Sequence, residues 1–335
     1  MKLLSRIKGR PYKRSKSNVL RYAIEELKFI KSFKDLRIFF RKVEFVLPRL
    51  TGRLDKYQTG PPALQIEPTN HCNVTCICCP SLRSSRSRGY MDIKLFRKII
   101  DDAARIGVMR IHLFLHGEPL LHPHIVEMIS YIKSKKLGIL ISTNGMPFNK
   151  EKIKAILSSG VNNADHFSFS IFGHSKEVHE TVMKRSNFDR IVKNILTFLA
   201  LRRKMKWNGP VIETNFYILP ENAHEEEKYV NKWRKYVDHV RVSGVISESF
   251  SKYKQKRNNI QLRTQTCLHL WQIMTVFWNG DVTVCCQDVD GDWILGNLNE
   301  QSIREIWNNK RLLVIKKIHK EKLFEKLPFC HKCDM

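Results

Sequence analysis

The sequence predicts an α/β protein whose core is a partial barrel of six strand–helix units, written (β/α)6. Two observations lead to this class. From about residue 62 onward, short apolar runs rich in β-branched residues alternate with longer stretches whose apolar residues recur at helical spacing. Turn residues follow the short runs, and a chain of 335 residues, 42% of them hydrophobic, can build one large domain and one small one.

The six predicted strands share a short apolar pattern that ends in polar or glycine-containing turns. They span residues 63–67, 110–115, 139–142, 166–171, 211–217 and 237–242. Helices are predicted after the first five strands at about residues 92–107, 123–136, 150–158, 188–203 and 224–235. Right-handed crossovers wind such units into a TIM-like barrel, in which the loops that follow the strands gather at one mouth.

Residues 1–61 are strongly basic and are predicted to form a helical N-terminal extension. Residues 1–60 hold 17 Lys and Arg against 5 Asp and Glu, and the whole chain carries a formal net charge of +27. An amphipathic run at residues 36–47 can dock on the barrel, which we favour, or lie on an anionic membrane surface. Because the sequence has no apolar run long enough to span a membrane and no signal-peptide pattern, we expect a cytoplasmic protein, free or peripheral to the inner membrane face.

The C-terminal part differs in pattern from the barrel. Residues 245–266 are polar and basic and are predicted to be a linker. Apolar and β-branched residues then flank Asn279-Gly280, which is typical of a β-hairpin, and helices are predicted at 302–308 and 310–322. The expected domains are therefore an extension at 1–61, a barrel at 62–244, and a linker with a small domain at 245–335.

Three cysteines follow the first predicted strand at an unusual spacing, Cys72-x3-Cys76-x2-Cys79. Clustered cysteines in a reducing compartment indicate metal or catalysis more often than disulfides. Zinc sites prefer two close ligand pairs, a pattern this loop lacks, whereas three thiolates on one loop can hold three corners of a four-iron cluster. The fourth iron would then have no protein ligand and could bind a small molecule.

This loop at the end of a barrel strand resembles the motif of the radical S-adenosylmethionine (SAM) enzymes. The resemblance implies a [4Fe-4S] cluster on Cys72, Cys76 and Cys79, with SAM bound to the open iron. His116-Gly117-Glu118-Pro119 is similar to that family's Gly-Gly-Glu-Pro turn, although His116 replaces the first glycine. The implied contacts with SAM, taken from the turns that follow successive strands, are Glu118, Ser142, Asn144, Ser170 and Leu219. Cys78 is expected to pack rather than to bind iron.

A second set of cysteines follows the pattern Cys267-x12-Gly280-x4-Cys285 and then Cys330-x2-Cys333. This pattern resembles the twitch domain, the shortened form of the SPASM extension. The resemblance implies one auxiliary [4Fe-4S] cluster with four thiolate ligands, and the alternatives are Cys286 in place of Cys285 and a zinc knuckle on the same residues. Four thiolates would leave no iron open, so electron transfer is the expected work of this cluster. The implied ligands are Cys267, Cys285, Cys330 and Cys333.

The resulting function is that of a radical SAM oxidoreductase. SAM would be cleaved reductively to a 5′-deoxyadenosyl radical that takes a hydrogen atom from the substrate, and the auxiliary cluster would assist an oxidation. The expected electron donor is ferredoxin- or flavodoxin-like, and the basic helical extension favours a small polar, sugar-like substrate over a peptide. A radical SAM maturase that modifies a peptide or protein is the alternative. The second alternative, which we disfavour, is a non-catalytic iron–sulfur or zinc protein that binds nucleic acid. The sequence contains no phosphate-binding loop, nucleophile elbow or dinucleotide-binding fingerprint.

Overall fold

The computed structural model describes residues 60–205, 208–243, 263–331 and 333, all within one compact unit. Apart from residues 60 and 61, the predicted basic extension lies outside the described residues. The membrane contact predicted for it and most of the predicted linker at 245–266 lie outside them too. In the described part of the chain, no helix combines the length and the apolar character that crossing a membrane requires.

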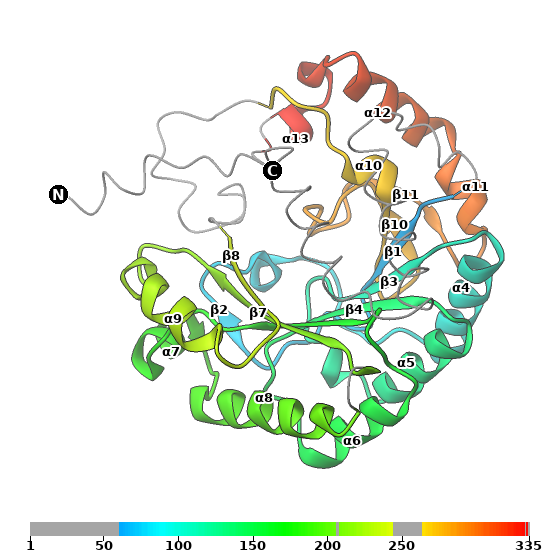
Figure 1. Ribbon diagram of the computed structural model, residues 1–335. Helices are drawn as coiled ribbons and strands as arrows, with labels where there is room; N and C mark the ends of the chain where they lie inside the picture. Colours follow the sequence, from blue (N-terminus) through cyan, green and yellow to red (C-terminus); the bar gives the residue numbers. More distant parts are fainter. Residues whose placement is uncertain (1–59, 206–207, 244–262, 332, 334–335) are drawn as a thin grey trace. The chain divides into compact units, whose positions relative to one another are not determined.

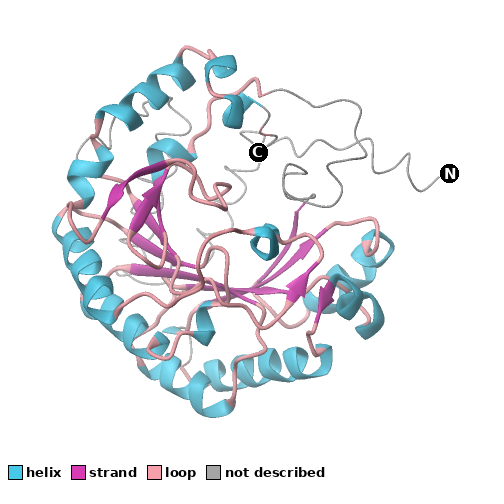
Figure 2. Cartoon of the chain, turned by 180° about the vertical axis from the view of Figure 1, so that it is seen from behind, coloured by secondary structure: helices cyan, strands magenta, loops and turns pink. Residues whose placement is uncertain are grey.

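Six parallel strands form one continuous side of a nine-stranded sheet, ending at the edge strand β8, which confirms the predicted α/β class and partial (β/α)6 barrel (Figures 1 and 2). In sheet order these strands are β1 (Ala63–Ile66), β3 (Arg110–Leu113), β4 (Gly138–Thr143), β5 (His166–Ser170), β7 (Val211–Tyr217) and β8 (His239–Ser243). The order follows the chain because each crossover carries the next parallel strand to the adjacent position.

Helices line the outer side of these strands (Figure 1). They are α4 (Ile93–Arg105), α5 (Ile125–Ser134), α6 (Lys150–Ser158), α8 (Phe188–Arg203) and α9 (Glu226–Trp233). Asp92 caps α4 as expected, since its carboxylate accepts hydrogen bonds from the backbone N–H groups of Lys94 and Leu95. The predicted helices are confirmed with boundaries that differ by a few residues.

The outer face of the sheet is apolar, and it is the face that the helices cover. Residues opposite each other in a parallel ladder project to the same face. One ladder runs through Ile66, Leu113, Ile141, Phe167 and Ile212, and each of these side chains is completely buried. This ladder supplies the core between sheet and helices.

The C-terminal segment extends the same sheet. The hairpin predicted around Asn279-Gly280 is confirmed: β9 (Ile273–Val276) and β10 (Asp281–Thr283) pair antiparallel, and Gly280 adopts the positive φ, +92°, that the turn requires. Strand β11 (Ile294–Asn297) follows, then α11 (Ile303–Trp307) and α12 (Lys310–Lys320). Strand β9 also pairs in parallel with β1, so that barrel and C-terminal segment share one sheet.

Several short elements were not expected from the sequence. Strands β2 (Thr75–Cys76) and β6 (Met183–Lys184) form a separate two-stranded sheet. The additional helices are α7 (Lys176–Val182), α10 (His269–Gln272) and α13 (Pro328–His331). The 3-10 turns are η2 (Pro80–Arg83), η3 (Pro119–Leu121), η5 (Ala223–Glu225) and η7 (Phe324–Lys326). Elements this short contain too few residues to show a periodic pattern.

Candidate active site

The first cysteine loop (residues 67–79) leaves the end of β1 and carries three of the predicted ligands. Cys72 is exposed, whereas Cys76 and Cys79 are half-buried. Cys76 belongs to β2, which is held by β6, and the N–H of Cys79 donates to the carbonyl of Cys76 over 3.1 Å. The short pairing with β6 therefore adds a backbone connection near the C-terminal end of this loop.

Cys78 belongs to a buried apolar cluster. Its buried neighbours are Val74, Phe172, Val182, Met183 and Leu219. Burial raises the pKa of the Cys78 thiol to about 12. A side chain in this place packs as a small hydrophobe.

Glu118 joins the turn after β3 to the end of β4. Its carboxylate accepts hydrogen bonds from the Thr143 hydroxyl and the Asn144 N–H, both at 2.7 Å, and from the Leu120 N–H at 3.1 Å. The Glu118 N–H donates in turn to the carbonyl of His71 at 2.8 Å. One buried residue, 2% exposed, thus connects three segments that lie far apart in sequence through its carboxyl group and its backbone N–H.

The environment of Glu118 shifts its acidity. Burial raises the pKa of Glu118 to about 7, and the hydrogen bonds from Asn144, Thr143 and Leu120, together with the charge of Lys152, oppose that rise only in part. At neutral pH the group is poised between its neutral and ionised forms. A cation placed beside it would favour the ionised form.

Asn144 brings the Glu118 turn to the first cysteine loop. The Asn144 side-chain amide donates to Asn73 Oδ1 at 2.9 Å and lies 3.9 Å from Cys72 Sγ. The sequence singled out Glu118 and Asn144 but missed Thr143 and Asn73. The polar Thr143-Asn144 turn after a strand was the sequence signal that could have identified Thr143. For Asn73 the only such signal was its position between two cysteines.

The other predicted SAM contacts lie at the ends of neighbouring strands. Ser142 is opposite Ser168 in the ladder between β4 and β5, and Ser170 is the last residue of β5. Leu219 follows β7 and is 1% exposed in the cluster that holds Cys78. All three therefore sit near the carboxyl ends of parallel strands, on the side from which the first cysteine loop leaves.

The inner face of the sheet is polar, in contrast to the outer face. The ladder register places Gln65, His112, Ser142, Ser168 and Glu213 on it. Alternation along the strands puts Arg241 on the same face.

Glu213 is a buried acidic residue of this inner face, on β7 next to the edge strand β8. Its carboxylate accepts a hydrogen bond from the Ser168 hydroxyl at 2.9 Å and pairs with Arg241 Nε at 3.2 Å. His166 Nε2 lies 3.7 Å from the same carboxylate. The alternating sequence of β5, His-Phe-Ser-Phe-Ser, was a readable signal for this polar face.

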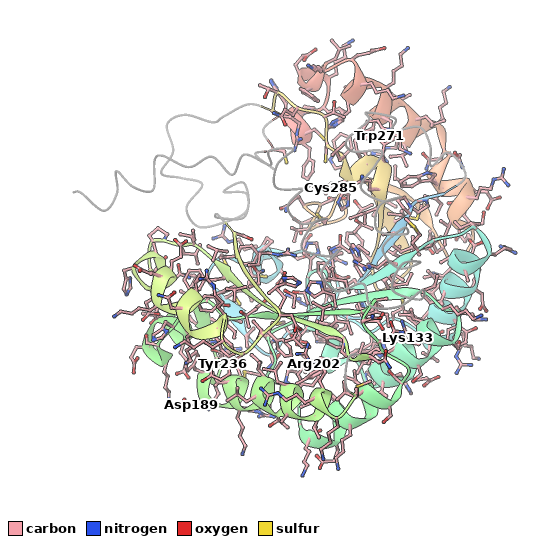
Figure 3. The ribbon with its side chains drawn as sticks, in the orientation of Figure 1. Lys133, Asp189, Arg202, Tyr236, Trp271 and Cys285 are labelled. Atoms are coloured by element: carbon pink, nitrogen blue, oxygen red, sulfur yellow. The ribbon has the colours of Figure 1, made fainter. Side chains whose placement is uncertain are left out.

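The second cysteine set comes together from three parts of the C-terminal segment. Burial, together with the neighbouring thiols of Cys285, Cys267 and Cys333, raises the pKa of Cys330 to about 12. A hydrogen bond with Cys286 raises the pKa of Cys285 well above its ordinary value, as does burial. Cys285 lies inside the row of outer helices (Figure 3). The thiols of the second set are thus close enough to influence one another.

Two side chains that the sequence did not single out contact this set. Arg263 Nη2 donates a hydrogen bond to Cys333 Sγ at 3.1 Å, and His319 Nδ1 accepts one from the Cys267 N–H at 3.3 Å. A guanidinium beside buried thiols stabilises their ionised form. The second site therefore has a positive neighbour at Cys333, and the carboxyl group of Asp288 lies near Cys285.

The donor sets fit iron–sulfur clusters. Among the described residues, no three His, Cys, Asp or Glu side chains gather tightly enough to hold a single metal ion. A four-iron cluster has a different requirement, because each thiolate binds a different iron atom. Besides Cys78, the first cysteine loop presents three free thiols, and the C-terminal segment has a further convergent group of thiols with a charged donor. These are the ligand types that such clusters use.

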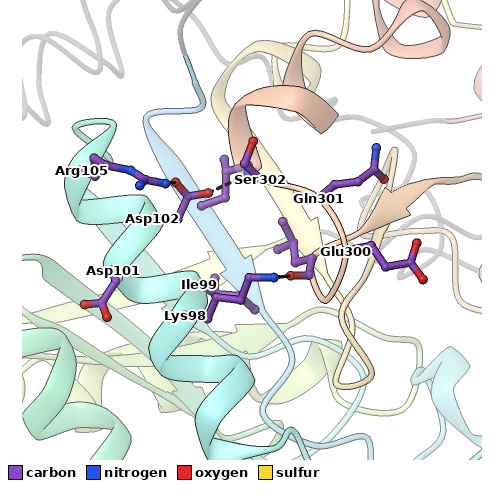
Figure 4. A pocket seen from close by; sticks show the side chains of 10 residues that line it. Lys98, Ile99, Asp101, Asp102, Arg105, Glu300, Gln301 and Ser302 are labelled. Carbon is purple, nitrogen blue, oxygen red and sulfur yellow. Dashed lines mark hydrogen bonds and ion pairs between the residues drawn. The ribbon is translucent and has the colours of Figure 1, made fainter.

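A surface cavity of about 610 Å³ lies elsewhere, between α4 and the segment before α11 (Figure 4). Lys98 Nζ donates there to the carbonyls of Leu298 and Asn299, and the Ile303 N–H donates to Asp102. None of the lining residues is a cysteine or a predicted SAM contact. These bonds attach the C-terminal segment to α4.

Comparison with known protein families agrees with this geometry. Residues 66–232 match the radical SAM superfamily model, and residues 267–334 match the SPASM model, an iron–sulfur cluster-binding domain. The chain belongs to the radical SAM superfamily and carries a C-terminal SPASM domain. Its cofactors are therefore SAM and the [4Fe-4S] cluster of the radical SAM domain. The SPASM domain implies auxiliary iron–sulfur clusters in addition.

Individual relatives are distant. The chain is 22% identical over 319 residues to the tungsten-containing aldehyde ferredoxin oxidoreductase cofactor-modifying protein of Pyrococcus furiosus, covering 81% of this chain and 87% of that protein. It is 21% identical to the SAM-dependent 2-deoxy-scyllo-inosamine dehydrogenase of Niallia circulans, covering 81% and 92%. The mycofactocin maturase MftC of Mycobacterium tuberculosis is 25% identical, but the match covers 46% of this chain and 38% of MftC.

Solved structures show the same fold. Streptococcus suis SuiB bound to SAM superposes with a TM-score of 0.63 at 16% identity, covering 90% of this chain and 78% of SuiB. BtrN in complex with SAM and 2-DOIA gives a TM-score of 0.53 at 19% identity, covering 82% and 93%. At these identities the likeness establishes the fold alone.

Gly117 provides a test of how tightly the Glu118 turn packs on the first cysteine loop. A Cβ at Gly117 would lie 2.2 Å from the Thr69 carbonyl oxygen and 2.7 Å from Asn70 Cα. We expect Gly117→Ala to lower the free energy of unfolding by about 1–3 kcal/mol, as overpacking typically does. Urea denaturation measures the change. Gly138→Ala is the control, because its nearest neighbour would be 3.4 Å away, and equal losses in both variants would contradict the tight turn.

Proposed function

We propose that this radical SAM protein oxidises a small polar substrate, such as an amino sugar or aminocyclitol, by removing hydrogen from a C–H bond. The observation that carries the proposal is the polar inner face of the sheet, where Glu213 is held by Ser168 and Arg241. A buried carboxylate that is not needed to join sheet and helices can accept hydrogen bonds from substrate hydroxyl or amino groups. The dehydrogenase from Niallia circulans, matched over 92% of its length, supports this substrate class.

The residues assigned to the first site have distinct roles in this proposal. Cys72, Cys76 and Cys79 hold the SAM-binding cluster, while Glu118 receives the SAM ammonium group. Asn144, Ser142 and Ser170 give polar contacts to the rest of SAM at the strand ends, and Leu219 supplies an apolar one. The chemistry that this cluster and SAM supply when bound is the abstraction of a hydrogen atom.

The second site is assigned to electron acceptance. Cys267, Cys285, Cys330 and Cys333 are its proposed ligands, and the electrostatic influence of Cys285 on both Cys267 and Cys330 favours Cys285 over Cys286. Arg263 adds a positive charge and a hydrogen bond to Cys333, which favour the more negatively charged, reduced state of a cluster. The proposed donor of the first electron is a ferredoxin- or flavodoxin-like protein.

A maturase that acts on a peptide is the second candidate. The match to MftC and the fold shared with SuiB favour it. It predicts hydrogen abstraction from a peptide and no reaction with free aminocyclitols. The isotope experiment below separates the two candidates.

The ligand assignment can be tested with two neighbouring cysteines. Protein reconstituted without oxygen and supplied with dithionite and SAM should release 5′-deoxyadenosine. We expect Cys76→Ala to abolish the release, because a cluster ligand is lost, and Cys78→Ala to retain it, because that thiol only packs against apolar side chains. Chromatography of the nucleoside product measures both. Release that survives Cys76→Ala but not Cys78→Ala would reverse the assignment.

SAM binding should depend on pH through Glu118. The group has a pKa of about 7 before a cation is present, and only its ionised form attracts an ammonium group. Affinity should therefore rise as the pH passes upward through about 7 and level off above it. Equilibrium dialysis of SAM against reconstituted protein measures this.

Glu118→Gln should remove that rise and weaken SAM binding by about tenfold or more, which is typical for a lost charged hydrogen bond. Glu127→Gln, at an exposed position on α5, is the control. A wild-type affinity that does not change with pH would contradict this role of Glu118.

The substrate class is tested by isotope transfer. Aminocyclitols and amino sugars carrying deuterium on carbon should pass deuterium into 5′-deoxyadenosine, detected by mass spectrometry. Glu213→Gln should reduce the transfer by about tenfold, because an amide replaces the charged acceptor, and Glu127→Gln should leave it unchanged. Transfer from deuterated peptides but from none of the small substrates would support the maturase instead.

A further inference from the structure

A buried charged cluster lies between the two cysteine loops. The guanidinium of Arg86 forms a two-pronged salt bridge with Glu67, at 2.9 and 2.8 Å. His116 Nδ1 lies 3.2 Å from Arg86 Nη2 and 3.6 Å from Glu67 Oε1. The Glu67 side chain is fully buried and that of Arg86 is 12% exposed. We call these three residues the charged clamp.

Each member of the charged clamp comes from a segment tied to the first cysteine loop. Glu67 begins that loop, directly after β1, and Arg86 follows Cys79 by seven residues. His116 belongs to the turn whose Glu118 N–H donates to the carbonyl of His71, next to Cys72. A shift of the clamp would therefore move the surroundings of Cys72 and Cys79.

The other side of the charged clamp holds the second cysteine loop (residues 284–290). His116 Nε2 donates to the carbonyl oxygen of Cys286 at 3.1 Å, and Arg86 Nε donates to the carbonyl of Val289 at 2.8 Å. The Arg86 guanidinium also lies over the Phe277 ring, 3.7 Å from its centre. The His116 and Arg86 side chains thus bind carbonyl oxygens at the two ends of residues 286–289, the segment that follows Cys285 directly.

Flanking contacts join the same two regions. The Ser85 N–H and hydroxyl both donate to Asp290, at 2.7 and 3.0 Å, and the Ser84 hydroxyl donates to the Val289 carbonyl at 3.0 Å. Trp278 N donates to Glu67 at 3.3 Å. The partners are about 200 residues apart in sequence, so this contact depends on the tertiary fold.

Stability alone gives a weak reason for burying these charges. Burial by itself raises the pKa of Glu67, but hydrogen bonds and charges from His116 and Arg86 outweigh it and lower the pKa to about 2. The carboxylate is therefore charged at neutral pH. Removing such a pair from water costs as much as its attraction returns, and apolar residues of similar volume often stabilise a protein equally well. What apolar side chains cannot supply is the fixed direction of hydrogen bonds to particular backbone oxygens.

We infer that Glu67, Arg86 and His116 act as positioning residues that hold the second cysteine loop in a set place against the first. Through His116, a short path of backbone and hydrogen bonds connects the two: Cys286 carbonyl, His116, Glu118 N–H, His71 carbonyl and then Cys72. The inference rests on the proposed function in assigning cluster ligands to both loops. The inference goes beyond the proposed function because it names the residues that fix the position of one cysteine loop relative to the other.

Hydrogen–deuterium exchange on the full chain tests the clamp. We expect His116→Gln and Arg86→Lys to speed the exchange of backbone amides at residues 284–290 and 69–79 by about tenfold or more, in protein with and without reconstituted clusters. Lys98→Met is the control, because Lys98 also bonds the C-terminal segment but at Leu298 and Asn299. It should leave both loops unchanged.

A spectroscopic readout distinguishes positioning from general stabilisation. In reduced, reconstituted protein, magnetic interaction between the two clusters should be seen by electron paramagnetic resonance, and it should weaken in His116→Gln and Arg86→Lys but not in Lys98→Met. Unchanged exchange at both loops in His116→Gln would overturn the inference. If Arg86→Lys loosens the whole barrel, His116→Gln decides alone. Failure to assemble clusters in the wild-type protein would instead contradict the proposed function, and exchange in the cluster-free protein would still test the clamp.

Discussion

The pairing of β9 with β1 is the constraint on which the arrangement of both sites depends. It places the C-terminal hairpin at the edge of the barrel sheet, in register from Ala63 opposite Ile273 to Ile66 opposite Val276. The Glu67 N–H continues the ladder with a bond to the Val276 carbonyl at 2.9 Å. Because the first cysteine loop begins at the end of β1, any displacement of the hairpin acts directly on the start of that loop.

Periodicity and turn chemistry made most of the fold readable from the sequence. The six parallel strands and the helices between them have regular patterns, and Asn279-Gly280 specifies its hairpin locally. The pairing of β9 with β1 could not be predicted in the same way, because the sequence around Ile273 does not specify which strand of the sheet β9 pairs with. Strands β2 and β6 could not be predicted for a simpler reason: a strand of two residues is too short to show the alternation of apolar and polar residues.

The candidate site was readable to a similar extent. Residues that recur at a spacing, such as Cys72, Cys76 and Cys79, and residues in turns after strands, such as Glu118 and Asn144, could be named in advance. The partners that give them their properties could not. Thr143 lies one residue from two predicted contacts, whereas Arg86 and Arg263 act through contacts that only the folded chain creates.

In the proposed function, the charged neighbours of each site influence where an electron is most stable. At the first site the Glu118 carboxyl is connected through Asn144 to the vicinity of Cys72, so that added negative charge there is opposed. At the second site the Arg263 guanidinium donates to Cys333 and compensates added negative charge, while the Asp288 carboxyl acts on Cys285 in the opposite sense. In the proposed function, Arg263 would favour an electron at the second site, and Asp288 would act against it. The charged clamp adds no such bias, because Glu67 and Arg86 neutralise each other. It can thus fix the distance between the sites while the neighbours of each cluster set the energy difference.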